Sequence, residues 1–509
     1  MTKFSLFGIG LMLARMLGPH AFGTYAVAYV ALQAIVQFNE LGVSLAIVRW
    51  PGDPAEIVPT VSTISLACSV LIYAGCFFAA PAYASAMGAP AATAVVRVLA
   101  LAVLSDGLTN APGALLQRTF RQGQRTFADQ VNIWLGTAVT VALAWSGDGA
   151  MSLAIGRLVG CTAGAILLLA FAPESLRLGF NRAKARPLLR FGLPLAGVNL
   201  LAFAVGSASQ IIVGHVLGPV RLGFYVLALN LGAWPIGMFS QPVRSVGLAV
   251  FSRIQHDREA TRTTFLSAAG LLSAVALPVC LLIGGTATPL VSFVYGARWV
   301  PAARPLLWLA LLSGLQVILL LAYDYFVAAG RSRFLLKTQA LWVVVLIPAL
   351  AVGARAYGLY GASIAELAVT AGCVLPLYLV ELSKAGIRVR AVVRHLWLSV
   401  VGAAVAGFLG WAAARIAPND FTALAVSGMA TAGIVGLLLY RTRAAVALLR
   451  SVSAEPAPEL PRSAGTVAQG ATARAGHVAP VPAAADGKPS ARPAAMRWDP
   501  AAAHYQETS

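Results

Sequence analysis

Met16–Tyr25 reads MLGPHAFGTY, and Val216–Tyr225, 200 residues further along the chain, reads VLGPVRLGFY. The Leu-Gly-Pro triplet, the next glycine and the tyrosine keep the same spacing in both stretches. A second pair, Gly88–Leu101 and Gly296–Leu311, matches at an offset larger by several residues, as insertions would produce. The chain therefore contains an internal duplication.

The composition is that of an integral membrane protein. Of the 509 residues, 59% are hydrophobic and only 11% are charged, whereas charged residues make up about a quarter of a soluble domain. The net charge of +19 does not indicate a nucleic-acid partner, because the basic residues stand singly or in small groups. They separate apolar runs of about 20 residues, the length that spans a bilayer.

Fourteen apolar runs are candidate membrane spans, so the sequence predicts an all-α fold. They cover residues 3–17, 22–48, 58–80, 93–116, 127–146, 149–172, 192–217, 223–250, 264–292, 304–329, 334–354, 357–381, 396–416 and 420–440. Arginine and lysine cluster in every second loop, near residues 118–125, 177–190, 244–262, 331–337 and 384–394. The positive-inside rule then places both termini in the cytoplasm. The first run would form only about 22 Å of helix, less than the roughly 30 Å hydrocarbon core, so we expect an in-frame start codon upstream of Met1.

The spans divide the chain into five segments. We expect a six-helix lobe, a basic amphipathic cytoplasmic linker, a second six-helix lobe, two additional transmembrane helices and a disordered Ala/Pro-rich cytoplasmic tail. These segments cover residues 1–172, 173–191, 192–382, 383–440 and 441–509. Copies that are six spans apart enter the membrane in the same direction, so a pseudo-twofold axis along the membrane normal should relate the lobes. This arrangement suits alternating access, with the transport path between the lobes.

Cysteine, histidine and tryptophan give no sign of a metal site. The five cysteines all lie inside apolar runs without a CxxC motif, so we interpret them as packing residues. We expect no cofactor beyond a coupling proton or sodium ion. Tryptophans near the ends of spans fit an interfacial aromatic belt; they are Trp50, Trp299, Trp308 and Trp397.

At the level of whole motifs, the sequence resembles a known transporter family. Leu13–Pro19 with Phe22–Tyr25 is similar to the opening signature of the polysaccharide transporter family, the Wzx-type flippases of the multidrug/oligosaccharidyl-lipid/polysaccharide exporter superfamily. Further resemblance lies in Leu41-Gly42 with Val48-Arg49, and in Tyr295–Ala303, which is similar to the family's loop before its tenth helix.

The resemblance extends over about residues 4–440. It implies a MATE-like fold of two six-helix lobes plus two helices. It also implies transport of an undecaprenyl-diphosphate-linked oligosaccharide across the bacterial inner membrane for lipopolysaccharide or exopolysaccharide biosynthesis. The implied partners are this lipid-linked substrate, membrane lipids, and the polymerase and glycosyltransferases of the same process.

Six ionisable residues inside the spans are candidates for transport, because a charge in hydrocarbon costs about 2.5 to 3.5 kcal/mol on insertion scales and tends to face a cavity or a partner. They are Glu40, Arg97, Asp106, Arg157, Asp324 and Glu366. Arg157 and Glu366 occupy corresponding places in the sixth and twelfth spans. Arg157 is interpreted as a phosphate-facing cation and Glu366 as its counter-ion or as a proton or sodium coupling site; a structural ion pair between the lobes is the alternative.

The remaining four candidates have weaker or competing interpretations. Asp106 could act as a coupling carboxylate or pack against a polar neighbour. Glu40 and Asp324 lie nearer the cytoplasmic ends, where charged side chains commonly reach water. Arg97 lies one turn inside the outer end of its span and can extend to the interface.

Three other functions remain open, and one of them is a non-transporting scaffold, which would predict intact surface polysaccharide after deletion of the gene. An ion-coupled multidrug or small-molecule exporter of the same superfamily would share the helix bundle, since a fold does not fix the cargo. A polytopic membrane glycosyltransferase or polymerase would act on similar lipids, but the chain has no DxD motif, P-loop or nucleophile–base pair, and no long outer loop. We therefore expect a transporter and not an enzyme.

Overall fold

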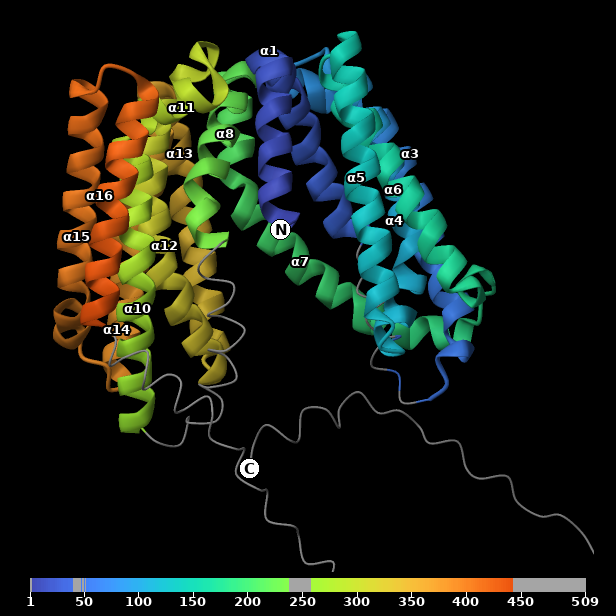
Figure 1. Ribbon diagram of the computed structural model, residues 1–509. Coiled ribbons are helices and arrows are strands. Elements are labelled where there is room, and N and C mark those ends of the chain that lie inside the picture. Colours follow the sequence, from blue (N-terminus) through green and yellow to red (C-terminus); the bar gives the residue numbers. More distant parts are fainter. Residues whose placement is uncertain (1, 40–46, 48–49, 51, 238–257, 443–509) are drawn as a thin grey trace, which may run out of the picture. The chain divides into compact units, whose positions relative to one another are not determined.

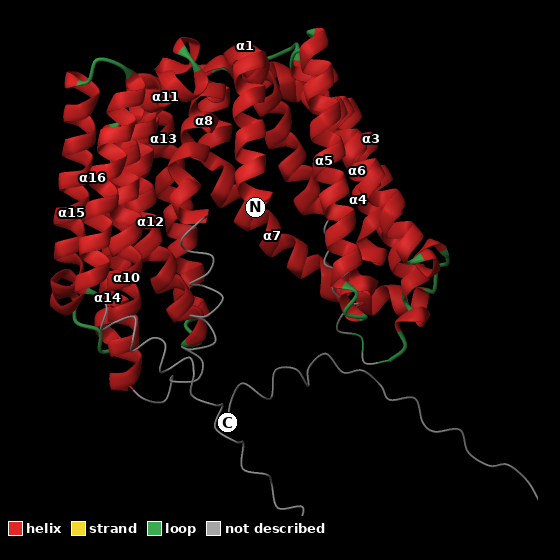
Figure 2. Ribbon diagram, viewed as in Figure 1, coloured by secondary structure: helices red, strands yellow, loops and turns green. Residues whose placement is uncertain are grey.

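The computed structural model describes residues 2–39, 47, 50, 52–237 and 258–442. Within these residues the regular structure is helical throughout (Figure 2). Eight of the helical segments described there are long and apolar enough to cross a membrane. The all-α membrane fold predicted from the sequence is confirmed.

The first lobe is built from helices that run up and down side by side (Figure 1). They are α1 (Thr2–Asn39), the 3-10 turn η1 (Pro54–Glu56), α3 (Val58–Ala86), α4 (Ala92–Arg118), α5 (Gln122–Ser146) and α6 (Ala150–Phe171). Within this lobe α4 packs against α1, α3 and α6, and α5 packs against α6.

The second lobe repeats this order. It comprises α7 (Arg182–Leu217), α8 (Pro219–Pro235), α10 (Arg258–Gly285), the short α11 (Ala287–Tyr295), the 3-10 turn η4 (Ala297–Ala302), α12 (Ala303–Ala328), α13 (Ser332–Val369), the π-helical turn η5 (Thr370–Val374) and α14 (Leu375–Lys384). Here α12 packs against α8, α10 and α13.

Two further helices complete the described part of the chain. They are α15 (Val389–Ile416) and α16 (Asp420–Arg441), and they pack against each other and against α10. The approach of α15 to α10 depends on glycine, because a methyl group at Gly285 would overlap the carbonyl oxygen of Gly407.

Two of the long helices are interrupted by a glycine, and this explains the helix count. Gly18 has φ 70° inside α1, and Gly358 has φ 63° inside α13. Each glycine divides its helix into two spans that run in opposite directions. With these divisions, and with η5 and α14 continuing the second part of α13, the described residues give the fourteen spans that the sequence predicts.

Glycine with positive φ recurs at the end of each lobe that is predicted to face outside. The turns at this end contain Gly18, Gly88, Gly147 and Gly149 in the first lobe and Gly218, Gly296 and Gly358 in the second. Residues other than glycine rarely adopt a backbone conformation with positive φ. Pro219 directly follows Gly218 at the first position of α8, where a proline is already suited to the helix. The Leu-Gly-Pro motif is therefore a tight turn between helices.

The segment predicted to link the lobes contains a 3-10 turn, η2 (Pro173–Leu176), followed by the start of α7. Asn181 caps α7 by accepting a hydrogen bond from the Ala183 amide. The predicted boundary between residues 191 and 192 falls inside this helix. The segment is attached to the first lobe through Ser62, whose hydroxyl donates to the Ser175 carbonyl at 2.9 Å.

Contact between the lobes and the polar clusters within them

The two lobes meet through the repeated motif itself. A methyl group at Gly23 on α1 would overlap the carbonyl oxygen of Pro219 on α8. In the reciprocal position, a methyl group at Gly223 would lie 3.1 Å from the carbonyl oxygen of Pro19 and 3.0 Å from the Cα of Gly23. Each glycine thus lets the backbone of the other copy approach, as expected for two copies related by a pseudo-twofold axis.

Trp299 in η4 fills the space beside this contact. It is 1% exposed, and its indole nitrogen donates a hydrogen bond to the Ala14 carbonyl on α1 at 3.1 Å. Its ring meets Phe22 of the first lobe and Phe224 of the second edge-on, with centroid distances of 5.4 and 5.8 Å. The prediction of an interfacial position for Trp299 was therefore wrong, because its place in a turn between spans also puts it between the lobes.

Polar contacts continue this junction on both sides. Arg15 on α1 donates to the carbonyl oxygen of Phe293 on α11, and the Nδ1 of His215 on α7 lies 2.7 Å from the carbonyl oxygen of Ala86 on α3. His215 thus takes part in an ordinary polar contact within the described part of the chain.

In the first lobe, Arg157 belongs to a polar and aromatic cluster formed by three helices. Its guanidinium, on α6, lies within electrostatic range of Tyr25 and Tyr29 on α1 and of Asp106 on α4. The two tyrosine rings are stacked with a centroid distance of 5.7 Å. Arg157 and Tyr29 are exposed, and Asp106 is half-buried. The cluster therefore presents a cation and aromatic rings at the surface of the lobe.

The position of Arg157 follows from the small residues around it. A methyl group at Gly156 would overlap the Thr140 hydroxyl on α5, and one at Gly160 would overlap the Asn132 carbonyl oxygen. Because α5 and α6 approach so closely, the side chain at position 157 cannot lie between them. It points along α6 toward α1 and α4, where its electrostatic partners are.

In the second lobe, Glu366 on α13 has a different environment. It is 8% exposed, and its Oε2 accepts a hydrogen bond from the Tyr225 hydroxyl on α8 at 2.6 Å. Ser209 on α7 is hydrogen-bonded to the same hydroxyl, and Tyr225 is fully buried. A carboxyl group is thus enclosed at the junction of three helices with a hydrogen-bond donor aimed at it.

The duplication relates these two clusters. Tyr25 corresponds to Tyr225, and Arg157 corresponds to Glu366. The structure groups each charge with the tyrosine of its own lobe. The sequence identifies both charges but assigns no role to either tyrosine. Aligning the two copies position by position, with the charges included, would have paired them.

Of the other three predicted residues, the structure describes Arg97 and Asp324. Arg97 packs its guanidinium over the Phe77 ring, 4.2 Å from the centroid, and its Nε donates to the Phe77 carbonyl oxygen at 3.2 Å. Asp324 on α12 is 3% exposed. Glu40 lies outside the described residues. A role in transport for any of the six stays a prediction.

The described residues contain no group of histidine, cysteine, aspartate and glutamate that could hold a metal ion.

Comparison with known proteins identifies the family to which this chain belongs. A model of polysaccharide biosynthesis proteins matches residues 12–304, which is more than half of the chain. The chain belongs to the polysaccharide biosynthesis protein family. The matched region of the family includes both Leu-Gly-Pro turns, Arg157 and Trp299.

Relatives within and near this family are named for transport and polysaccharide biosynthesis. The chain is 24% identical over 370 residues to the succinoglycan biosynthesis transport protein ExoT of Rhizobium meliloti (strain 1021), covering 72% of this chain and 74% of that one. It is 23% identical over 403 residues to the lipopolysaccharide biosynthesis protein WzxC of Escherichia coli (strain K12), covering 77% and 81%.

Two solved structures share the fold. The lipid II flippase MurJ in an inward closed conformation aligns with a TM-score of 0.70 and 13% identity, covering 87% of this chain and 98% of that one. An inward-facing multidrug resistance MATE family transporter aligns with a TM-score of 0.58 and 15% identity, covering 75% and 94%. This member of the polysaccharide biosynthesis protein family is thus a multi-pass membrane protein with the fold shared by MurJ and MATE transporters.

Proposed function

We propose that this protein is a flippase that moves an undecaprenyl-diphosphate-linked oligosaccharide from the inner to the outer leaflet of the bacterial cytoplasmic membrane. The observation that carries the proposal is the reciprocal glycine contact between α1 and α8. At the two glycines the backbones can approach and separate without side chains of their own, while Trp299 packs between Phe22 and Phe224 beside them. Alternating access requires such a contact at each end of the path in turn.

The relatives support the substrate class. ExoT and WzxC are named for succinoglycan transport and lipopolysaccharide biosynthesis, and the MurJ fold carries a lipid in a known case. Glycosyltransferases would supply the lipid-linked oligosaccharide, and a polymerase would consume it. By the positive-inside rule, both termini of the flippase would lie in the cytoplasm.

Arg157 is the residue we assign to the diphosphate. An arginine offers a planar set of donors that fits phosphate oxygens, and the exposed residue Arg157 lies in electrostatic range of the two stacked tyrosines. Asp106 lies in electrostatic range of Arg157 and would orient the guanidinium. Glu366 would couple transport to a proton or a sodium ion, since its carboxyl group is buried with one donor supplied by Tyr225.

Complementation of a flippase-null strain tests the Arg157 assignment. Arg157→Ala should reduce export of surface polysaccharide at least tenfold at normal membrane levels, and Arg157→Lys should retain part of it because the charge remains. Arg355→Ala is the control, because Arg355 is also an exposed arginine but lies in α13 between two predicted spans, outside the Arg157 cluster. Full export by Arg157→Ala would remove it from the transport path.

Two substitutions, one at Glu366 and one at Tyr225, distinguish a role of Glu366 in ion coupling from a purely structural role. Glu366→Gln keeps an acceptor for the Tyr225 hydroxyl, so the protein should reach the membrane in normal amounts while export falls. Tyr225→Phe leaves a buried carboxyl without its donor and should destabilise the fold by about 1 to 3 kcal/mol, measured as a lower melting temperature. Normal export by Glu366→Gln would show that the group is structural.

The decisive measurement is a leaflet-resolved assay with purified protein in vesicles that contain the lipid-linked oligosaccharide. Transfer that depends on Arg157 supports the proposal. Transport of a cationic drug with no lipid transfer would favour the multidrug exporter instead.

A further inference from the structure

Two adjoining cavities lie at one end of the second lobe, where α8, α12 and the second part of α13 begin. The larger one, of about 740 Å³, is lined by Arg221, Arg304, Tyr357 and Tyr360 together with backbone around Pro301. The smaller one, of about 390 Å³, lies between α10, α12 and α15. Thr288, Ala303 and Arg304 line both cavities, so the two are direct neighbours.

The larger cavity has the charge of an anion site. Arg221 and Arg304 are both exposed, and neither cavity has an aspartate or a glutamate in its lining. Three helices start at this cavity, at Pro219, at Ala303 and directly after Gly358. The amide groups at helix N-termini carry partial positive charge and favour phosphate.

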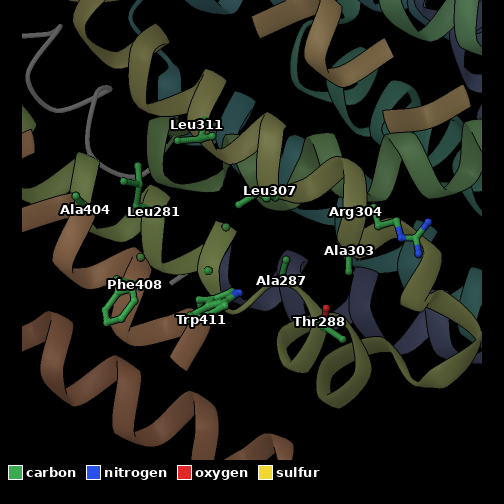
Figure 3. A pocket seen from close by; sticks show the side chains of 13 residues that line it. Leu281, Ala287, Thr288, Ala303, Arg304, Leu307, Leu311, Ala404, Phe408 and Trp411 are labelled. Atoms are coloured by element: carbon green, nitrogen blue, oxygen red, sulfur yellow. The ribbon is translucent and has the colours of Figure 1, made fainter. Parts of the chain in front are cut away.

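The smaller cavity is apolar. Its walls come from Leu281, Leu307, Leu311, Phe408 and Trp411, with space left by glycine and alanine on α10 and α15. Figure 3 shows Arg304 and Thr288 toward one end of this cavity and Phe408 and Trp411 toward the other. A ligand that filled both cavities would therefore carry an anionic group and an apolar chain.

The first lobe shows that this corner of the fold does not require Arg221. Gly149 and Gly358 occupy equivalent turns, and a methyl group at Gly149 would lie 3.7 Å from Ala21, whereas one at Gly358 would lie 3.8 Å from the Arg221 guanidinium. Ala21 and Arg221 are 200 residues apart, the offset of the duplication. The same corner is thus built with alanine in one copy and arginine in the other.

The residues around the cavities are of the types that gather at the membrane interface. Arg415 lies over the Trp411 ring, 4.3 Å from the centroid, and Tyr357 is 75% exposed beside Arg221. Tryptophan, tyrosine and arginine gather at the membrane interface. The apolar cavity also includes residues of α15, which lies outside both six-helix lobes, and so it is separate from the contact between the lobes.

We propose that these two cavities bind one anionic phospholipid of the surrounding membrane, with its phosphate between Arg221 and Arg304 and one acyl chain between α10, α12 and α15. The lipid would hold α15 against the second lobe. This site is independent of the transported substrate and of the function proposed above.

The test uses the full-length protein purified in detergent and titrated with dioleoyl phosphatidylglycerol. Native mass spectrometry counts bound lipid, and thermal unfolding reports the stabilisation that binding produces. The double variant Arg221→Gln/Arg304→Gln should bind about tenfold more weakly, as expected for the loss of two exposed charge contacts. Ala404→Trp, which places a large side chain into the apolar cavity from α15, should also weaken binding while both arginines remain.

Arg298→Gln is the matched control, because Arg298 is exposed in η4 at the same end but lines neither cavity. It should bind the lipid like the unaltered protein. Equal weakening by Arg298→Gln would overturn the proposal in favour of general surface charge. Equal stabilisation by inorganic phosphate would overturn it in favour of a simple ion site, and a preference for the lipid-linked oligosaccharide over phosphatidylglycerol would assign the cavities to the substrate.

Discussion

At the scale of single residues, the duplication exposes a difference between two equivalent turns. Phe120, between α4 and α5, has φ 56° and is 90% exposed, whereas the second copy has Gly330 with φ 70° between α12 and α13. A left-handed backbone costs a side chain about 1 kcal/mol or more, and glycine avoids this cost. Phe120 is therefore strained at a position where the other copy is relaxed.

Substitutions at Gly330 and Phe120 should change the free energy of unfolding differently. Gly330→Ala should lower the free energy of unfolding by about 1 kcal/mol, and Phe120→Gly should not lower it, because the native φ favours glycine. Melting temperatures of the purified variants measure both changes. A loss of stability in Phe120→Gly as large as that in Gly330→Ala would contradict the explanation by backbone strain.

The charged residues of the two clusters could be predicted from the sequence, but the residues around them could not. Arg157 and Glu366 could be identified because a charge inside an apolar run is conspicuous. Their partners could not, because Tyr25, Tyr225 and Ser209 belong to common types and only the packing of α1, α7 and α8 brings them to the charges. Trp299 was misplaced for a similar reason: position along the chain does not tell whether a turn is covered by another lobe.

At the scale of helices, close backbone packing at glycine determines where the lobes touch. Gly23→Ala should disfavour the conformation in which α1 contacts α8, since the added methyl group overlaps the Pro219 carbonyl oxygen. Overpacking of this kind costs about 1 to 3 kcal/mol. We expect a lower melting temperature and slower export.

Gly75→Ala is the control for this substitution. Gly75 lies within α3, and a methyl group there meets no atom within 4 Å. Alanine should be neutral or slightly stabilising at that position because it favours helix. If Gly23→Ala behaved like Gly75→Ala, the contact between the lobes would not limit the motion.

The helices themselves were largely predictable. Apolar length gave the spans, and the Leu-Gly-Pro spacing gave the turns at Gly18 and Gly218. Two features were not: α7 starts at Arg182, inside the segment predicted to be a linker, and α11 is a separate short helix before η4. Hydropathy cannot distinguish a helix that leaves the bilayer from one that lies on its surface, and this is the reason for the first difference.

At the scale of the whole molecule, orientation in the membrane can be tested directly. Ser146 and Ser383 are both exposed at opposite ends of their spans. If both termini are cytoplasmic, a membrane-impermeant maleimide should label Ser146→Cys in intact cells and Ser383→Cys only after lysis. The unaltered protein, with its native cysteines, is the control. The reverse labelling pattern would invert the proposed topology.

α7 has a mechanical consequence for any motion of the lobes. It extends over 36 residues, about 54 Å at 1.5 Å per residue, and it packs against α3 of the first lobe as well as α8 and α13 of the second. At its start, Lys184 forms an ion pair with Glu56 at 2.8 Å. In the alternating-access cycle proposed above, α7 would act as a lever between the two lobes, and its stiffness would limit how far they separate.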